Sequence, residues 1–234
     1  MNLQLTTSSL SHGADETLRA NAGATRLLPH KARSLPTAAV LAALLLGGFA
    51  AGEAHAESSK FRLTSPDLES GFFDRQFTLN GFGCTGSNVS PALKWSNVPA
   101  GTKSLALQVL DKDALTDSGF WHWTVYNIPA TATGLVQGAG NPSGRLPAPA
   151  FGGANDFLDT GATGGNGNYG GPCPPVSDKP HRYVFTLYAL AVDDVEAVSG
   201  IPKTATPALH SFILNRGLGN QLLGKASFTA RYGR

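Results

Sequence analysis

The sequence predicts a mainly β domain built from antiparallel sheets, and three observations support this class. Short apolar or alternating segments recur along the chain between turns rich in glycine and proline. Only one late segment has helical periodicity, and one more strand follows it, so helices do not alternate with strands as they would in a parallel sheet. Glycine is abundant, at 28 of 234 residues, which is typical of a protein rich in loops.

The first strands are predicted by three short segments. Residues 61–64 read as a strand closed by a Ser-Pro pair, and residues 76–80 alternate polar and apolar side chains before a glycine. A glycine-rich turn at residues 83–88 follows. Residues 91–95 predict an edge strand, because their proline cannot donate a hydrogen bond to a neighbouring strand.

The central sheet is predicted by three longer apolar segments. Residues 104–110 form a buried strand that runs directly into Asp111. Residues 121–128 form the next strand, which a proline stops. Residues 183–190 are apolar on both faces, which favours an interior position in the sheet.

The rest of the chain predicts one long loop, one helix and a last strand. Eight of the twenty residues 152–171 are glycine, so we expect a long, mobile surface loop that has a function or no fixed conformation. Thr206 and Pro207 suit the cap and the first position of a helix that ends near Gly217. Residues 226–231 alternate and predict the final strand.

Residues 1–56 predict a signal peptide with a long polar N-terminal region. The apolar run at residues 38–51 has about the length of a signal-peptide core and is too short to span a bilayer. The pattern Ala54-His55-Ala56 predicts cleavage before Glu57, which would leave a periplasmic or secreted chain without a transmembrane segment. An uncleaved anchor is the alternative. Residues 57–234 then form a single domain.

Charge and cysteine content narrow the class further. The net charge of +2 gives no electrostatic case for nucleic acid or for an anionic membrane surface. Cys84 and Cys173 both lie in the part expected to be exported, and a pair in an oxidising compartment favours a disulfide over two free thiols. Neither cysteine has a second one at CxxC spacing, so we expect no metal site.

Polar side chains stand where three predicted strands meet loops. Asp111 and Asp113 follow one strand, His122 begins the next, and His181 and Tyr183 begin a third. If the strands are neighbours, these side chains converge at one end of the sheet. A carboxylate beside a histidine favours the protonated imidazole, and tyrosine adds a neutral donor, so the set suits a phosphate, sulfate or carboxylate group. Taken singly, each residue also fits an ordinary turn or core position.

Several of these residues lie in motifs that occur in one order in a known family. The motifs are DKDA at residues 111–114, HWTVYNIP at 122–129, YGGPCPP at 169–175 and HRY at 181–183, with GCTG at 83–86 and NVSPALKW at 88–95 upstream. The resemblance that they carry extends over roughly residues 61–231, nearly the whole chain expected after cleavage. The chain thereby resembles the phosphatidylethanolamine-binding protein (PEBP) family, in its bacterial Raf-kinase-inhibitor-like YbhB/YbcL branch.

This resemblance implies a large central antiparallel sheet with a smaller flanking sheet and a C-terminal helix. It also implies a small cavity for a phosphate-like anion or a phospholipid head group, with no catalytic activity common to the family and no cofactor. Carried over by motif position, the ligand-binding residues would be Asp111, Asp113, His122, Pro174, His181 and Tyr183.

The sequence departs from the family pattern around this cavity. The usual Asp-Pro-Asp-Ala-Pro is Asp111-Lys112-Asp113-Ala114-Leu115, which lacks both prolines and adds a cation. Val176 replaces a glycine that often follows the double proline, and a glycine-rich insert precedes Tyr169. The acid and histidine positions are kept, so anion binding is still expected, with ligand size and selectivity open.

The expected function is therefore an exported binding protein that does not turn over a substrate. The alternative is an interaction module of the protease- or kinase-inhibitor type that acts on an unknown protein partner through the loop at residues 152–171. A hydrolase using an Asp–His pair is a minor alternative. It lacks a GxSxG nucleophile motif, and Cys173 could serve as the nucleophile only if it were a free thiol.

Overall fold

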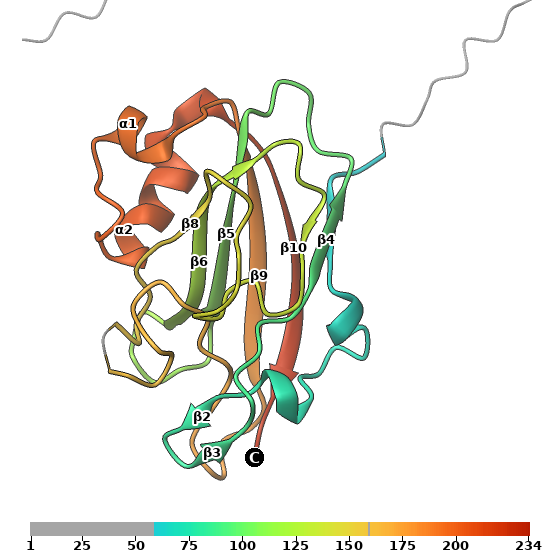
Figure 1. Cartoon of the computed structure of the whole chain (residues 1–234), viewed down its shortest axis with the longest axis vertical. Coiled ribbons are helices and arrows are strands. Elements are labelled where there is room, and N and C mark those ends of the chain that lie inside the picture. The colour runs from blue at the N-terminus through green and yellow to red at the C-terminus, as the bar shows by residue number, and fades with distance from the viewer. Residues whose placement is uncertain (1–58, 159) are drawn as a thin grey trace, which may run out of the picture. The chain divides into compact units, whose positions relative to one another are not determined.

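The computed structural model describes residues 59–158 and 160–234, so the expected signal peptide at residues 1–56 lies outside the described residues. The described chain is organised around a five-stranded antiparallel sheet, which stands upright in Figure 1. Its strands, in spatial order, are β10 (Leu222–Tyr232), β9 (His181–Leu190), β5 (Ser104–Asp111), β6 (Phe120–Pro129) and β8 (Phe151–Gly152). The interior position expected for residues 183–190 is confirmed, because β9 pairs with both β10 and β5.

Smaller elements complete the architecture. A three-stranded sheet has the order β1 (Arg62–Thr64), β4 (Leu93–Ser96) and β7 (Gly134–Leu135), and a short hairpin joins β2 (Asn80–Gly81) to β3 (Cys84–Thr85). The helices are α1 (Val195–Ser199) and α2 (Pro207–Phe212), which continues as a π-helical turn at Ile213–Gly217. Single 3-10 turns occur at Pro66–Leu68, Arg75–Phe77 and Gly219–Gln221.

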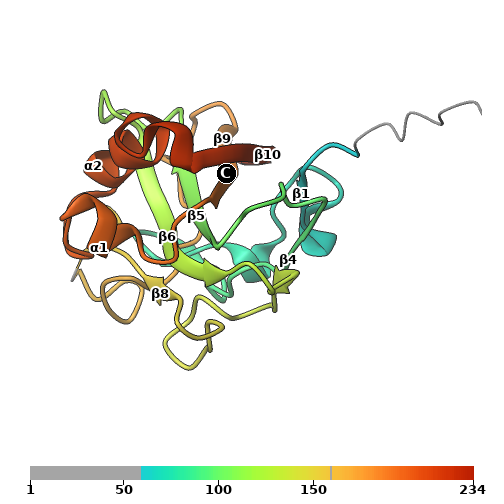
Figure 2. The same ribbon diagram turned by 90° about the horizontal axis from the view of Figure 1, so that it is seen from above.

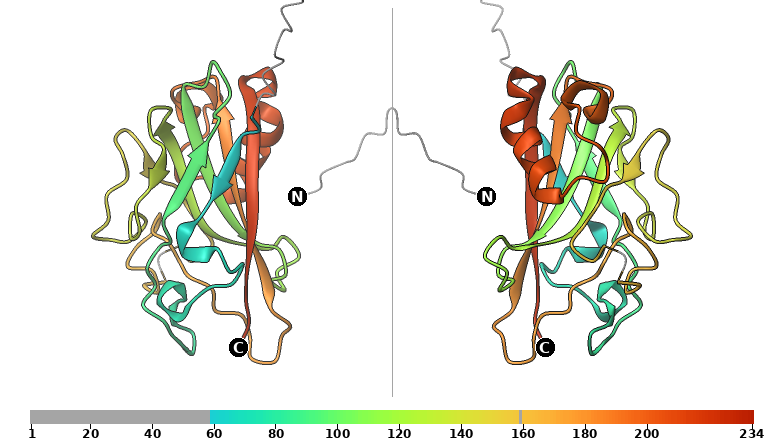
Figure 3. Two further views of the ribbon diagram at one scale, coloured as in Figure 1. Left: turned by 90° about the vertical axis from the view of Figure 1, so that its right-hand side faces the viewer. Right: turned by 90° about the vertical axis from the view of Figure 1, so that its left-hand side faces the viewer.

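The large sheet separates two hydrophobic cores. Figures 2 and 3 show α1 and α2 over one face and the three-stranded sheet over the other. Successive side chains of a strand point to opposite faces, so Leu105, Leu107 and Val109 of β5 join the core between the sheets, whereas Ala106 joins the core under the helices. This two-sided burial explains why the central strands read as continuous apolar runs.

The late helix begins as predicted. The hydroxyl of Thr206 accepts a hydrogen bond from the Leu209 amide at 3.3 Å, and Pro207 is the first helical residue. The short helix α1 was not predicted. It begins at a similar cap, where Asp194 accepts from the Ala197 amide at 3.1 Å, and its length of five residues is too short to produce a periodic pattern.

Two predictions about the first strands are wrong. Residues 76–79 lie outside the strands and only Asn80 enters β2, because the Leu79 amide donates to the Pro172 carbonyl and the Thr78 carbonyl accepts from Asn88, both in irregular segments. Residues 91–95 are not at an edge, since β4 lies between β1 and β7. Pro91 precedes the strand and therefore does not interrupt its hydrogen bonds.

The loop at residues 152–171 is not a surface loop along its whole length. Asn155, Phe157 and Tyr169 are buried, with exposed fractions of 0%, 4% and 1%. The Asn155 side chain donates to the Asn168 carbonyl at 2.6 Å, which closes the loop on itself. Buried anchors at both ends therefore hold the glycine-rich segment against the domain.

Candidate functional site

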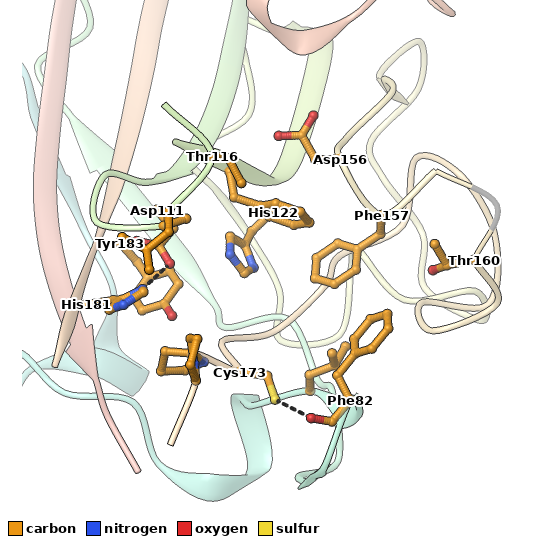
Figure 4. A pocket seen from close by; sticks show the side chains of 16 residues that line it. Phe82, Asp111, Thr116, His122, Asp156, Phe157, Thr160, Cys173, His181 and Tyr183 are labelled. Atoms are coloured by element: carbon orange, nitrogen blue, oxygen red, sulfur yellow. Dashed lines mark hydrogen bonds and ion pairs between the residues drawn. The ribbon is translucent and has the colours of Figure 1, made fainter. Parts of the chain in front are cut away.

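The strand pairing brings the predicted polar residues to one edge of the large sheet. Asp111 is the last residue of β5 and is paired with Tyr183 of β9 on one side and with Phe120 of β6 on the other. Because the strands are antiparallel, the end of β5 lies beside the beginnings of β6 and β9. Asp111, His122, His181 and Tyr183 are thereby close together, as Figure 4 shows, and each is at most 5% exposed.

A cavity of about 420 Å³ opens beside this group. That volume lies within the range of roughly 300–1,000 Å³ typical of small-molecule sites. Asp111, His122, His181 and Tyr183 supply polar lining on the sheet side, which we call the polar floor. Most of the remaining wall is apolar and is formed by Leu79, Phe82, Ala114, Leu115, Phe120, Phe157, Pro174 and Pro175, with the disulfide-bonded Cys173.

The imidazole of His181 lies between two carboxylates. Its Nδ1 is 2.7 Å from Oδ2 of Asp111, and its Nε2 is 3.2 Å from Oδ2 of Asp178. Burial acts to lower the pKa of His181, but the hydrogen bonds and negative charges of Asp111 and Asp178 outweigh it and raise the pKa above its usual value. His181 thus fits the expected protonated histidine beside a carboxylate.

His122 does not fit that expectation. Its Nδ1 lies 2.8 Å from the Gly170 carbonyl oxygen, which can only accept, so Nδ1 carries the proton and donates it. Burial lowers the pKa of His122 to about 4, against the smaller opposing effects of that hydrogen bond and of Asp111. Phe120, Phe157 and Tyr183 each pack against the ring in a T-shaped arrangement, at centroid distances of 5.1, 5.3 and 5.0 Å. It is therefore neutral at pH 7, with an unprotonated Nε2.

Tyr183 contributes a hydroxyl that has no hydrogen-bond partner among residues 59–158 and 160–234. Burial and the negative charge of Asp111 raise its pKa, so the hydroxyl keeps its proton. Leaving a buried polar group unpaired costs about 1–3 kcal/mol. A hydroxyl at the cavity wall in this condition is a donor that a ligand oxygen could satisfy.

Asp113 has a different position from the other predicted residues. It is absent from the cavity lining, and its carboxylate binds Arg182 through Nε at 2.9 Å and Nη2 at 2.8 Å. The hydrogen bond from Arg182 is the main cause that lowers the pKa of Asp113 to about 2. The structure thus brings Asp111, His122, Pro174, His181 and Tyr183 together around the cavity and places Asp113 beside them, in an ion pair.

The segment Tyr169-Gly170-Gly171 holds His122 in place. The Gly170 amide donates to the His122 carbonyl at 3.0 Å, while the Gly171 amide donates to Oδ1 of Asn88 at 2.7 Å. A Cβ on Gly170 would overlap the Phe157 ring, and one on Gly171 would overlap the Phe77 carbonyl. Glycine is therefore required here by close packing.

The predicted disulfide is present and forms part of the cavity wall. Cys84 and Cys173 are bonded with a Cα–Cα distance of 6.0 Å, which ties β3 to the proline-rich segment. Nε of Arg234 donates to the Pro174 carbonyl at 2.6 Å from the other side. Both cysteines are consumed by this bond, so Cys173 offers no thiolate for the hydrolase alternative.

Sequence reasoning missed several residues of the site. Phe120 stands two residues before His122 in a strand, a spacing that places both on one face, and this signal could have found it. Asn88 lies inside a family-like motif, but its contact with Gly171 spans 83 residues. Asp178 and Leu115 carried no usable signal, because loop conformation is not encoded in hydrophobic periodicity.

Neither a metal site nor a membrane span is found in the described part of the chain. Residues 59–158 and 160–234 contain no group of three His, Cys, Asp or Glu side chains placed to hold a metal ion. Over the same residues, no helix has both the length and the apolar character needed to cross a bilayer.

Comparison with known proteins places this geometry in a family. The sequence profile described as phosphatidylethanolamine-binding protein matches residues 69–232. YbcL of Escherichia coli is 43% identical over 162 residues, which are 68% of this chain and 82% of YbcL. YbhB of the same organism is 39% identical over 140 residues, or 59% of this chain and 84% of YbhB. A Mycobacterium tuberculosis relative named as a candidate lipoprotein, LppC, is 42% identical over 113 residues, 47% of this chain and 48% of LppC.

A solved structure agrees with the sequence comparisons. The crystal structure of Escherichia coli YbcL, whose description calls it a member of the mammalian PEBP family, has a TM-score of 0.64 and 41% identity. The match covers 75% of this chain and 99% of that structure. Because the profile, the related sequences and the fold agree over most of the described residues, this chain belongs to the phosphatidylethanolamine-binding protein family.

Proposed function

We propose that this chain is an exported binding protein whose cavity takes a phosphate-type anion, either free or as part of a phospholipid head group. It acts by binding a ligand or a partner protein and does not turn over a substrate. The observation that carries the proposal is the cavity itself, in which buried polar groups lie under an apolar wall. An apolar enclosure strengthens the few polar contacts that fix a small ligand.

Individual groups in the cavity support an oxygen-rich ligand. The Tyr183 hydroxyl of β9 is a buried donor without a partner in the described chain, and His122 presents its ring Nε2 from β6, on the other side of β5. Beside them, Pro174 and Phe157 form apolar surfaces that suit the carbon atoms of a head group. We include Asp111 and His181 among the ligand-binding residues and assign Asp113 an indirect role, through Arg182.

Export is supported by two observations. The Cys84–Cys173 disulfide is of the kind that persists in oxidising compartments, and the relative LppC is named as a candidate lipoprotein. We expect processing of the signal peptide before Glu57. Cell fractionation followed by N-terminal sequencing of the recovered protein tests this, and a chain that keeps its first residues in the cytoplasm would contradict it.

Isothermal titration calorimetry with phosphate and with phosphoethanolamine tests the binding site. We expect His122→Ala and His181→Ala to weaken binding of either anion at least tenfold relative to the unchanged protein. Asp193→Asn is the matched control, because this exposed carboxylate pairs with Lys103 beyond the other ends of β5 and β9. The anion site would be refuted if the unchanged protein bound neither anion. It would also be refuted if both alanine variants bound as tightly as the unchanged protein.

The alternative function, an interaction module, can use only part of the loop at residues 152–171, because several of its residues are buried. Phe157 and Thr160 line the cavity, so shortening the loop at residues 152–171 would also damage the proposed binding site. Leu158 is an exposed apolar residue of that loop, with an exposed fraction of 54%. The variant Leu158→Ser distinguishes the anion-binding protein from the interaction module. If it no longer binds a partner protein but binds phosphate as before, the interaction module is favoured.

A further inference from the structure

The cavity lacks the cations expected of an anion site. Of its lining residues, none is lysine or arginine, and His181 is the one that carries positive charge. Both ring nitrogens of His181 already face carboxylates, those of Asp111 and Asp178. With Asp156 also in the lining, the charges that surround the cavity sum to a negative value when all carboxylates are ionised.

The hydrogen-bonding groups of the polar floor also suit an anion poorly, because acceptors outnumber donors. The Asp111 carboxylate only accepts. His122 has its one proton on Nδ1, facing the Gly170 carbonyl, which leaves Nε2 as an acceptor with no hydrogen bond in the described part of the chain. Tyr183 is the single donor hydroxyl of the floor. A fully deprotonated phosphate, which also only accepts, would place its oxygens against two further acceptors.

One added proton removes this conflict. We infer that the cavity binds its anion together with one proton taken up from solvent, which is held between Nε2 of His122 and a ligand oxygen. The inference rests on the proposed anion site and concerns the chemical form in which the anion is bound. With the proton in place, Nε2–H and the Tyr183 hydroxyl become two donors directed at the anion, and the added positive charge offsets the carboxylates.

The position of His122 makes it the acceptor of this proton. Its Nδ1 stays bonded to Gly170, so protonation at Nε2 needs no rotation of the ring. The titratable groups that act on it are Asp111 from β5 and His181 from β9, Tyr183 of β9 packs against its ring, and Asp156 from the loop at residues 152–171 lines the same cavity. Burial lowers the pKa of His122 to about 4, so above pH 6 its Nε2 is unprotonated, and the proton must be taken up when an anion binds.

Two probes distinguish where the proton resides. Phosphoethanolamine is a monoester with a second pKa near 6, so at pH 8 it arrives deprotonated and a proton taken up on binding could reside on its phosphate or on the protein. Glycerophosphoethanolamine has the diester of a lipid head group and no titratable phosphate proton at pH 8, so any proton taken up must reside on the protein. Calorimetry at pH 8 in buffers of different ionisation enthalpy counts the protons taken up for each probe.

We expect uptake of about one proton for both probes, with Kd rising about tenfold per pH unit between pH 7 and 8. His122→Gln is the matched variant, because its amide can donate without gaining a proton. This variant should bind the diester with no proton uptake and a flat pH dependence. Diester binding to the unchanged protein without proton uptake would overturn the inference and leave the anion site intact, whereas absence of any anion binding would refute the proposed function.

A second measurement covers the case in which His122→Gln fails to fold. Nitrogen-15 NMR of the imidazole rings at pH 8 should show Nε2 of His122 change from unprotonated to protonated when the diester is added. An unprotonated Nε2 in the complex overturns the inference. So does proton uptake that persists in a folded His122→Gln variant, because the proton would then reside on another group of the cavity, such as the Asp111 carboxylate.

Discussion

Two histidines at the same edge of the sheet have pKa values shifted in opposite directions. His122 makes its one hydrogen bond to a neutral carbonyl and is surrounded by aromatic edges, so burial dominates and lowers its pKa. His181 is also buried, but two carboxylates reverse the effect. The neighbouring charges, and not burial alone, therefore decide which imidazole is protonated.

The stability of the protein should fall in weak acid because of His122. The pKa of His122 is about 4 in the folded state and 6.5 in the unfolded state, so the unfolded state binds the proton more tightly. The contribution of His122 to the free energy of unfolding is therefore complete above pH 6.5 and is lost as the pH falls toward 4. The difference corresponds to about 3 kcal/mol of unfolding free energy. Urea denaturation at pH 7 and pH 4 checks this.

His122→Gln provides the comparison for that measurement, because glutamine does not titrate. We expect the variant to lose about 3 kcal/mol less than the unchanged protein between the two pH values. Asp113 titrates near pH 2 and so contributes little in this window. An equal loss in both proteins would show that His122 is not the group responsible.

At the scale of elements, the segment from Tyr169 to Gly171 controls the cavity without contributing a ligand group. Gly170→Ala should destabilise the protein by about 1–3 kcal/mol, because the new methyl group overlaps the Phe157 ring. It should also weaken anion binding, since Phe157 lines the cavity. Thermal unfolding and calorimetry measure the two effects.

Gly81→Ala is the matched control for this substitution. Gly81 lies in β2, and a methyl group there would be 3.9 Å from Ala162 and Leu79, an ordinary contact distance. The control should therefore change stability far less than Gly170→Ala. Similar losses in the two variants would indicate a general effect of alanine and not the overlap with Phe157.

The disulfide links two elements far apart in sequence, so it should have a large effect on stability. Cys84 and Cys173 are separated by 89 residues, and closing a loop of that length stabilises the folded state by about 4 kcal/mol in the chain-entropy treatment. The double variant C84S/C173S should lose that amount in urea denaturation. A loss below about 1 kcal/mol would mean that the hairpin and the cavity wall are held mainly by other contacts.

The elements that sequence reasoning predicted are those in which burial follows a strand or helix period. The segments at β5, β6 and β9 are long, apolar and bounded by turn residues, and their ends located Asp111, His122 and His181. Residues 76–80 have the same alternation, yet the backbone of Gln76, Thr78 and Leu79 bonds to loops and only Asn80 enters a strand. Contacts such as that of Asn88 with Gly171 depend on the final fold and leave no local pattern.

On the scale of the whole molecule, the cavity depends on both layers that surround its sheet edge. Tyr183 belongs to the core between the two sheets, and its ring packs against Phe73 at a centroid distance of 5.3 Å. Asp111 ends a strand whose Ala106 lies in the core under the helices. The site is therefore fixed by the folding of the domain as one unit.

The domain should fold and bind without the expected signal peptide. Among residues 59–158 and 160–234, the members of both cores, the disulfide and the cavity lining lie between residues 61 and 232, and the family profile begins at residue 69. A chain that begins at Glu57 should therefore show the same unfolding free energy and the same phosphate affinity as the full chain. Urea denaturation and calorimetry on the two purified proteins check this. If the shorter chain unfolds more easily or binds more weakly, residues before Glu57 contribute to the folded domain and the proposed cleavage site must lie elsewhere.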